Sequence, residues 1–241
     1  MMHYESTRGT APILGFGEAM MTGLARDGGL YVPQTVPVLP RGEIAAMAGQ
    51  SYEEVAFRVM RPYLGGFFGD DEFRGLIAKA YAGFGHDARA PLVQLAPNHF
   101  LLELFHGPTL AFKDVAMQLL SRLMDWALER RHTRATIVGA TSGDTGGAVA
   151  DALHNQENVD NLVFFPKGSI TERQRRQMTT LQDNIYAFEV NGDFDVCQAL
   201  AKQLLGDKAF ARDLFKDAER FTSANSISLG RLLPQAVYPF F

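Results

Sequence analysis

A single lysine, Lys113, lies between apolar residues at the point where a turn leads into a helix. The segment HGPT at 106–109 predicts the turn, and apolar residues at helical spacing from 110 to 126 predict the helix. This spacing places Lys113 in the first helical turn, where exposed backbone N–H groups disfavour an ammonium group. Burial beside Phe112 would disfavour the charged form further. Both effects favour a neutral amine, which is the form that a Schiff-base nucleophile needs.

An ordinary surface lysine that pairs with acidic neighbours is the alternative. Asp114 follows Lys113 directly, and its carboxylate would stabilise the charged ammonium. Lysine side chains are mostly exposed in proteins, so both interpretations stay open on the local sequence. The preceding run HFLLELF at 99–105 is apolar and short, which predicts a buried strand leading into the turn.

A second candidate site is the Gly-rich segment ATSGDTGG at 140–147. It lies between an apolar run at 135–139, which predicts a buried strand, and a helix expected over 145–154. Backbone N–H groups at such a junction bind anions, glycines let a ligand approach the main chain, and three hydroxyl side chains add donors. The segment lacks the dinucleotide-binding and P-loop spacings. A small anionic ligand and a plain tight turn are the two interpretations.

Two further polar segments follow predicted strands. Lys167 comes after a strand ending at residue 165, at the carboxyl edge of a parallel sheet where ligands usually bind. Its cation could meet a substrate phosphate or simply be solvated. Asn225 lies in a Ser- and Asn-containing segment before a helix expected near residue 227. That segment is either an N-cap cluster or another edge of the site.

The elements that position these segments alternate between strand and helix from about residue 91. Strands are expected over 99–105, 135–139, 161–165 and 185–190, and helices over 113–131, 145–154, 171–181 and 194–205. This alternation predicts an α/β fold with a parallel sheet. Residues 1–90 have mainly helical patterning, including a helix over 51–60 that starts with a capping-box pattern. We therefore expect a helical N-terminal domain over 1–90 and part of an α/β domain over 91–241.

Composition narrows the class of protein. The chain has 241 residues, 46% hydrophobic and 21% charged, with a formal net charge of -4, which is typical of a globular protein. Lys and Arg are scattered, which argues against nucleic-acid and membrane-surface binding. The single cysteine, Cys197, excludes an internal disulfide and a cysteine metal cluster and fits a reducing compartment. Without an apolar leader or a run of membrane-spanning length, the sequence predicts a cytoplasmic protein with no metal site.

Several motifs together resemble threonine synthases, which are pyridoxal-phosphate enzymes of fold type II. They are STRG at 6–9, DGGLYVP at 27–33, HGPTLAFKD at 106–114, ATSGDTGG at 140–147, FPKGSI at 165–170 with Gln174, and SANSISLGRLLPQ at 223–235. They occur in the order of the family and extend from one end of the chain to the other. This makes the resemblance more specific than any single motif.

The resemblance implies a carbon–oxygen lyase that converts O-phospho-L-homoserine and water into L-threonine and phosphate, the last step of threonine biosynthesis. It implies pyridoxal 5'-phosphate held as an aldimine on Lys113, and it suggests a homodimer. The cofactor contacts that we expect besides Lys113 are Phe112, Asp144 and Asn225. The expected substrate contacts are Ser142, Gly143, Thr145 and Gly146 at the α-carboxylate, and Lys167 at the phosphate.

Two alternatives to this activity stay open. One is another fold type II enzyme, such as a threonine synthase-like phospho-lyase or a dehydratase of hydroxy amino acids. The other is a non-catalytic relative that binds an anion or metabolite. Threonine synthases hold the cofactor phosphate on a Gly-rich loop beyond the SANS segment, whereas this chain has only isolated glycines after Gly147 and ends in the apolar run LLPQAVYPFF. The sequence therefore predicts the N-terminal half of a longer threonine synthase.

Overall fold

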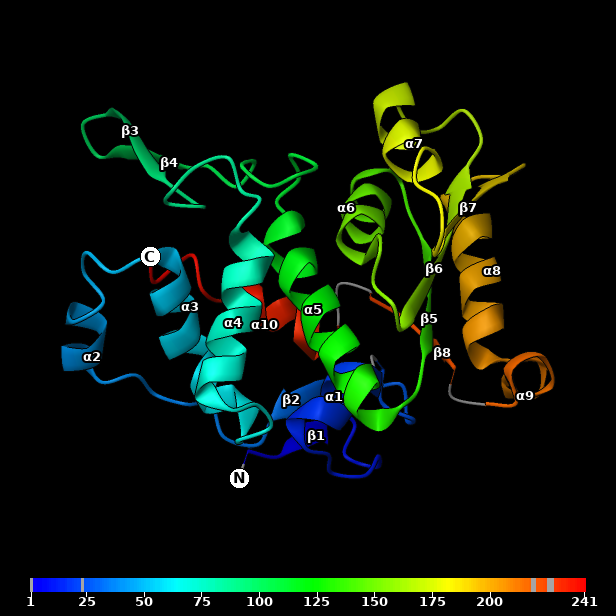
Figure 1. Ribbon diagram of the computed structural model, residues 1–241, viewed down its shortest axis with the longest axis horizontal. Helices are drawn as coiled ribbons and strands as arrows, with labels where there is room; N and C mark the ends of the chain where they lie inside the picture. The colour runs from blue at the N-terminus through cyan, green and yellow to red at the C-terminus, as the bar shows by residue number, and fades with distance from the viewer. Residues whose placement is uncertain (1, 23, 218–219, 225–227) are drawn as a thin grey trace. The chain divides into compact units, whose positions relative to one another are not determined.

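The computed structural model describes residues 2–22, 24–217, 220–224 and 228–241, which form two compact units (Figure 1). Unit 1 comprises Met1–Leu119 and Ile227–Phe241, and unit 2 comprises Leu120–Ser226. Helix α5 (Asp114–Arg131) runs from the first into the second. The domain boundary that we predicted near residue 90 falls inside unit 1. The division of the chain into domains at that residue therefore stays a prediction.

Unit 1 is mainly helical, and its helices pack around aromatic side chains. Its elements are β1 (Tyr4–Ser6), α1 (Phe16–Thr22), β2 (Tyr31–Pro33), α2 (Arg41–Ala45), α3 (Tyr52–Met60), the 3-10 helix η1 (Arg61–Leu64), α4 (Asp70–Tyr81), β3 (Leu92–Ala96), β4 (His99–Leu102), the start of α5, and α10 (Leu229–Gln235). The Ser51 half of the predicted capping box is confirmed, because Ser51 Oγ accepts a hydrogen bond from Glu54 N at 3.2 Å, whereas the Glu54 carboxylate pairs with Arg58. The ring of Tyr52 packs edge-on against that of Tyr81 in the core of this unit.

Asp27 joins the two N-terminal motifs of the sequence. Its Oδ1 accepts hydrogen bonds from Ser6 Oγ at 2.7 Å and Gly29 N at 2.9 Å. Its Oδ2 accepts from Thr10 N, Thr10 Oγ1 and Ala11 N at 2.9 to 3.1 Å. These bonds, led by the one from Ser6, hold the pKa of Asp27 well below its ordinary value of 3.8. The STRG and DGG motifs are therefore one structural joint, which holds the antiparallel pair β1–β2.

We expect acid to weaken this joint. Since the carboxylate of Asp27 titrates lower in the folded chain than in the unfolded chain, its contribution to stability is present above about pH 4 and is lost as the pH falls further. Asp27→Asn should lower the melting temperature at pH 7. Between pH 5 and pH 3 the melting temperature of this variant should fall less than that of the original chain. Glu5→Gln, which alters one exposed hydrogen bond to Gln34, is the control for thermal scans across this range. Equal acid sensitivity in both variants would contradict the assignment.

The run at 99–105 is not a buried strand, so this prediction was wrong. Residues of β4 pair antiparallel with β3 across a two-residue turn, in which Asn98 has φ of +57°. The hairpin is largely exposed, with Leu92 at 63% and Phe100 at 50% exposure. A short apolar run shows only that a strand forms, because its burial depends on elements elsewhere in the chain.

Unit 2 is the predicted α/β sheet. Its elements after α5 are β5 (Ala135–Ala140), α6 (Asp144–Leu153), β6 (Val159–Pro166), α7 (Glu172–Thr179), β7 (Ile185–Val190), α8 (Phe194–Gly206), α9 (Lys208–Phe215) and β8 (Phe221–Thr222). The strands lie in the order β7-β6-β5-β8, and all pairings are parallel, which confirms the α/β parallel-sheet prediction. Helices α6 and α8 lie on opposite faces of the sheet (Figure 1). Helix α9 and the two-residue strand β8 were not predicted from the sequence.

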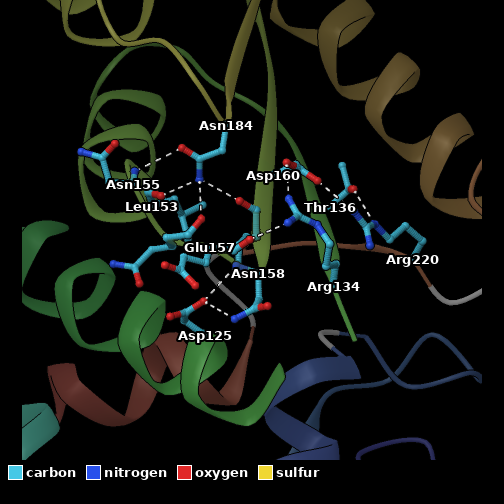
Figure 2. Close-up of polar contacts among 12 residues, drawn as sticks. Asp125, Arg134, Thr136, Leu153, Asn155, Glu157, Asn158, Asp160, Asn184 and Arg220 are labelled. Atoms are coloured by element: carbon cyan, nitrogen blue, oxygen red, sulfur yellow. Dashed lines mark hydrogen bonds and ion pairs between the residues drawn. The ribbon is translucent and has the colours of Figure 1, made fainter. Parts of the chain in front are cut away.

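A network of hydrogen bonds and ion pairs lies at the amino ends of these strands (Figure 2). Asn184, just before β7, donates from Nδ2 to the carbonyl oxygens of Leu153, Gln156 and Val159 at 2.7 to 3.2 Å, and its Oδ1 accepts from Asn155 N at 3.2 Å. One buried amide thereby ties the end of α6 to the start of β6. The carboxylate of Asp160 on β6 also pairs with Arg134 at 3.0 Å and with Arg220 at 2.9 Å.

Candidate active site

Lys113 is the last residue before α5 and not, as predicted, part of the first helical turn. Its carbonyl oxygen accepts from Met117 N at 2.9 Å, so the lysine still directs the start of the helix. The ammonium nitrogen Nζ lies 4.5 Å from the ring centre of Phe112. That ring is 42% exposed, so it shields one side of the amine without burying it. The side chain of Lys113 is partly buried.

A buried carboxylate holds the loop that carries the lysine. Asp114 is fully buried, and it accepts hydrogen bonds from Thr109 N at 2.8 Å and Thr109 Oγ1 at 2.6 Å. A Cβ atom on Gly107 would lie 2.4 Å from Cβ of Asp114, so only glycine fits there. Thr109 lies five residues before the start of α5, and its side chain binds the carboxylate of Asp114. Asp114 is a structural residue that the sequence suggested only as a charge beside Lys113.

The Gly-rich loop after β5 is folded around Thr141. The buried Thr141 Oγ1 accepts hydrogen bonds from Gly143 N at 2.9 Å and Gly146 N at 2.8 Å. Two N–H groups that were expected to face a ligand carboxylate thus have an acceptor within the loop. The Ser142 side chain is exposed and that of Thr145 is partly buried at the start of α6. Hydroxyl groups and first-turn N–H groups are the donors that this arrangement leaves for an anion.

The glycines of this loop also allow α7 to pack closely against α6. A Cβ atom on Gly143 would lie 2.4 Å from Cδ of Gln174, and one on Gly146 would lie 2.4 Å from Sδ of Met178. One on Gly147 would lie 2.8 Å from Oε1 of Gln177. We predicted that these glycines let a ligand approach the main chain. The structure shows that they also leave room for side chains of α7. The sequence alone could not reveal it, since α7 lies about one helix and one strand further along the chain.

Parallel pairing brings three of the predicted segments to one edge of unit 2. β5 lies between β6 and β8, so the Gly-rich loop, Lys167 and Ser223 all follow the carboxyl ends of neighbouring strands. Lys167 is exposed, and its backbone N donates to Val190 O at 3.0 Å. Asp144 is exposed at the start of α6. Asn225 lies outside the described residues, and Lys113 and Phe112 belong to unit 1.

Removing the Thr141 hydroxyl should loosen the Gly-rich loop. Thr141→Val keeps the shape of the side chain but leaves two buried N–H groups without an acceptor, which should cost about 2 kcal/mol. Thr141→Ser retains the hydroxyl and loses one methyl group, so its cost should be about 1 kcal/mol or less. Urea denaturation of the two variants measures the difference. Equal stabilities would show that the hydroxyl does not fold the loop.

Two family models match successive parts of the chain. Residues 3–81 match the model described as threonine synthase N terminus. Residues 85–229, which include Lys113 and the Gly-rich loop, match the model described as pyridoxal-phosphate dependent enzyme. The chain belongs to the pyridoxal-phosphate-dependent enzymes. The resemblance found in the sequence is thereby confirmed, and so is pyridoxal phosphate as the cofactor of the family.

Relatives of this pyridoxal-phosphate-dependent enzyme include threonine synthases from several organisms. The chain is 48% identical to the threonine synthase of Pseudomonas aeruginosa over 99% of its own length and 50% of the relative. It is 36% identical to human threonine synthase-like 2, over 100% of its own length and 49% of the relative. A crystal structure of pyridoxal-phosphate-bound threonine synthase from Brucella melitensis matches with 49% identity and a TM-score of 0.92, over 100% of this chain and 51% of the other. The chain spans about half the length of the relatives that it matches.

The described residues of this enzyme also bear on metal binding and on membrane insertion. Among them, no three His, Cys, Asp or Glu side chains gather in a way that could hold a metal ion. Within the same residues, no helix has the length and apolar character needed to cross a membrane. Cys197 is buried in α8, and burial raises the pKa of its thiol, as suits a small core side chain.

Proposed function

We propose that this chain provides the reactive lysine and the carboxylate-binding loop of a threonine synthase, which converts O-phospho-L-homoserine and water into L-threonine and phosphate. The observation that carries the proposal is the 48% identity to a threonine synthase over 99% of the chain. That match includes both the lysine loop and the Gly-rich loop. We further propose a homodimer, as the family resemblance suggests, and a cytoplasmic location, which the single cysteine fits.

Lys113 fits a cofactor that is attached through an aldehyde, because it offers a primary amine at a loop held in place by Asp114. When bound, pyridoxal phosphate supplies the electron sink that stabilises negative charge on the substrate carbons. The Nζ atom of Lys113 would hold the cofactor and then move protons at Cα and Cβ of the substrate. Phe112 would cover one side of that amine. Asp144 and Asn225 would complete the cofactor contacts.

The Gly-rich loop of unit 2 would bind the α-carboxylate of the substrate. Its hydroxyl donors are Ser142 and Thr145, and the start of α6 favours an anion there. Gly143 and Gly146 would contribute the shape of the loop, because their N–H groups bind Thr141. Lys167, at the same edge of the sheet, would attract the substrate phosphate.

Cofactor capture tests the role of the lysine. The chain is mixed with pyridoxal phosphate, the visible absorbance band is recorded, and the mixture is reduced with borohydride. Peptide mass spectrometry then locates the adduct. We expect modification at Lys113 in preference to every other lysine. Modification spread over exposed lysines would contradict a dedicated site.

A threonine synthase-like phospho-lyase is the second candidate, since human threonine synthase-like 2 is similar over the whole chain. The products distinguish the two activities. Incubation with O-phospho-L-homoserine and pyridoxal phosphate should release threonine and phosphate in equal amounts. Phosphate accompanied by a 2-oxo acid in place of threonine would favour the phospho-lyase.

A further inference from the structure

Gln174, in the first turn of α7, connects two parts of unit 2 through its side-chain amide. Its Oε1 accepts hydrogen bonds from Thr171 N at 3.0 Å and Thr171 Oγ1 at 2.9 Å, within the capping box of α7. Its Nε2 donates to Oδ1 of Asp144, the first residue of α6, at 2.8 Å. One amide therefore joins the starts of two helices that lie far apart in the sequence.

The backbone of the Gly-rich loop is shaped to admit this amide. Gly143 has φ of +133°, a conformation that side-chain-bearing residues rarely adopt. The position where its Cβ would stand is only 2.5 Å from Nε2 of Gln174. The backbone conformation favours glycine at this position, and the absence of a side chain leaves room for the amide of Gln174 in its observed place.

Helix α7 also makes an apolar contact with the start of α6. The helix has eight residues, of which Met178 alone is buried, and Met178 fills the space beside Gly146. Gln174 thus supplies a hydrogen bond to the α6–α7 contact, and Met178 supplies an apolar contact. The hydrogen-bond partner of Gln174 is the carboxylate of Asp144, which is charged. Hydrogen bonds to charged acceptors are stronger than those between neutral groups.

We propose that Gln174 is a positioning residue, which holds Asp144 and Gly143 so that the loop at 142–146 keeps the conformation that binds the substrate carboxylate. The support of the loop by Gln174 stands on the contacts described above. The binding of a carboxylate by that loop rests on the proposed function.

Hydrogen–deuterium exchange of the ligand-free chain tests the support of the loop. Gln174→Glu keeps the capping box but turns a carboxylate oxygen toward Asp144 in place of the N–H donor. Exchange of the loop amides should rise about tenfold, the effect of losing one hydrogen bond of ordinary strength. Adding Asp144→Asn supplies a new donor from the other side, so the double variant should regain the original protection. A purely structural effect of position 174 would not be reversed by a change at 144.

Gln177→Glu is the matched control, since it makes the same change one turn further along α7, beside Gly147. It should leave the loop amides unchanged. The proposal is overturned if Gln174→Glu fails to raise exchange, if Asp144→Asn fails to restore protection, or if the control opens the loop equally.

A second measurement addresses the ligand. O-phospho-L-homoserine should slow exchange of the loop in the original chain, and Gln174→Glu should raise the concentration needed for half protection about tenfold. If the original chain shows no protection, the proposed carboxylate site fails, and the ligand-free measurement still decides whether Gln174 supports the loop. If both proteins are protected at the same concentration, Gln174 does not position the binding residues.

Discussion

Lys113→Ala is expected to reduce conversion of O-phospho-L-homoserine about 10³-fold or more, and to abolish trapping of pyridoxal phosphate at this loop. Alanine removes the only amine of the 106–114 segment, so no neighbouring side chain can attach the cofactor or move a proton at the substrate carbons. The fold should be unchanged, because Asp114 and Thr109 hold the loop without the lysine side chain.

Lys79→Ala is the control for this experiment. Lys79 is an exposed lysine in the last turn of α4, so its loss should leave both capture and turnover as they were. Borohydride trapping and threonine formation are measured on the three proteins side by side. Substantial turnover by Lys113→Ala, or an adduct that persists on another residue of the chain, would refute the role of this lysine.

Asn184→Asp should give the largest loss of stability, about 4 kcal/mol, although the side chain keeps its shape. The amide donors that serve Leu153 O, Gln156 O and Val159 O are replaced by oxygen, which removes a hydrogen bond from each of these carbonyl groups and places a carboxylate against them. Several such penalties act together because one side chain serves four backbone groups (Figure 2).

The control lies one residue earlier. Asp183 is exposed, and its contact with His154 is long, at 3.8 Å. Asp183→Asn should therefore change stability by no more than about 0.5 kcal/mol. Urea denaturation monitored by far-ultraviolet circular dichroism compares the two variants. A similar small effect for both would show that the Asn184 network contributes little to the stability of unit 2.

The sequence was sufficient for features that depend on near neighbours. The strands β5, β6 and β7 and the helices between them follow from local apolar periodicity, and the lysine and Gly-rich loops follow from residue types at predicted element ends. Helix α5 begins one residue later than expected, because its start depends on the bonds between Asp114 and Thr109. Errors of one residue in a helix boundary arise where side chains compete for the terminal backbone N–H groups of the helix.

Features that depend on distant partners were beyond the sequence. Asp27 gave no signal as the acceptor for residues 6–11, and nothing in the loop itself showed that Gly143 makes room for Gln174. The strand predicted at 99–105 was assigned to the core because its exposure depends on what packs against it. The sequence therefore predicted which residues to consider, whereas the contacts showed how several of them act.

The β3–β4 hairpin has a consequence for handling the protein in solution. In the described structure its two strands pair only with each other, and residues 91–102 contain no Asp, Glu, Lys or Arg. Charged side chains and prolines usually keep such edges from pairing with those of other molecules, and here Pro91 precedes β3 while Pro97 lies in the turn. Leu95 is 57% exposed and Phe100 is 50% exposed, so both add apolar surface. We therefore expect this hairpin to promote aggregation of the chain at high concentration.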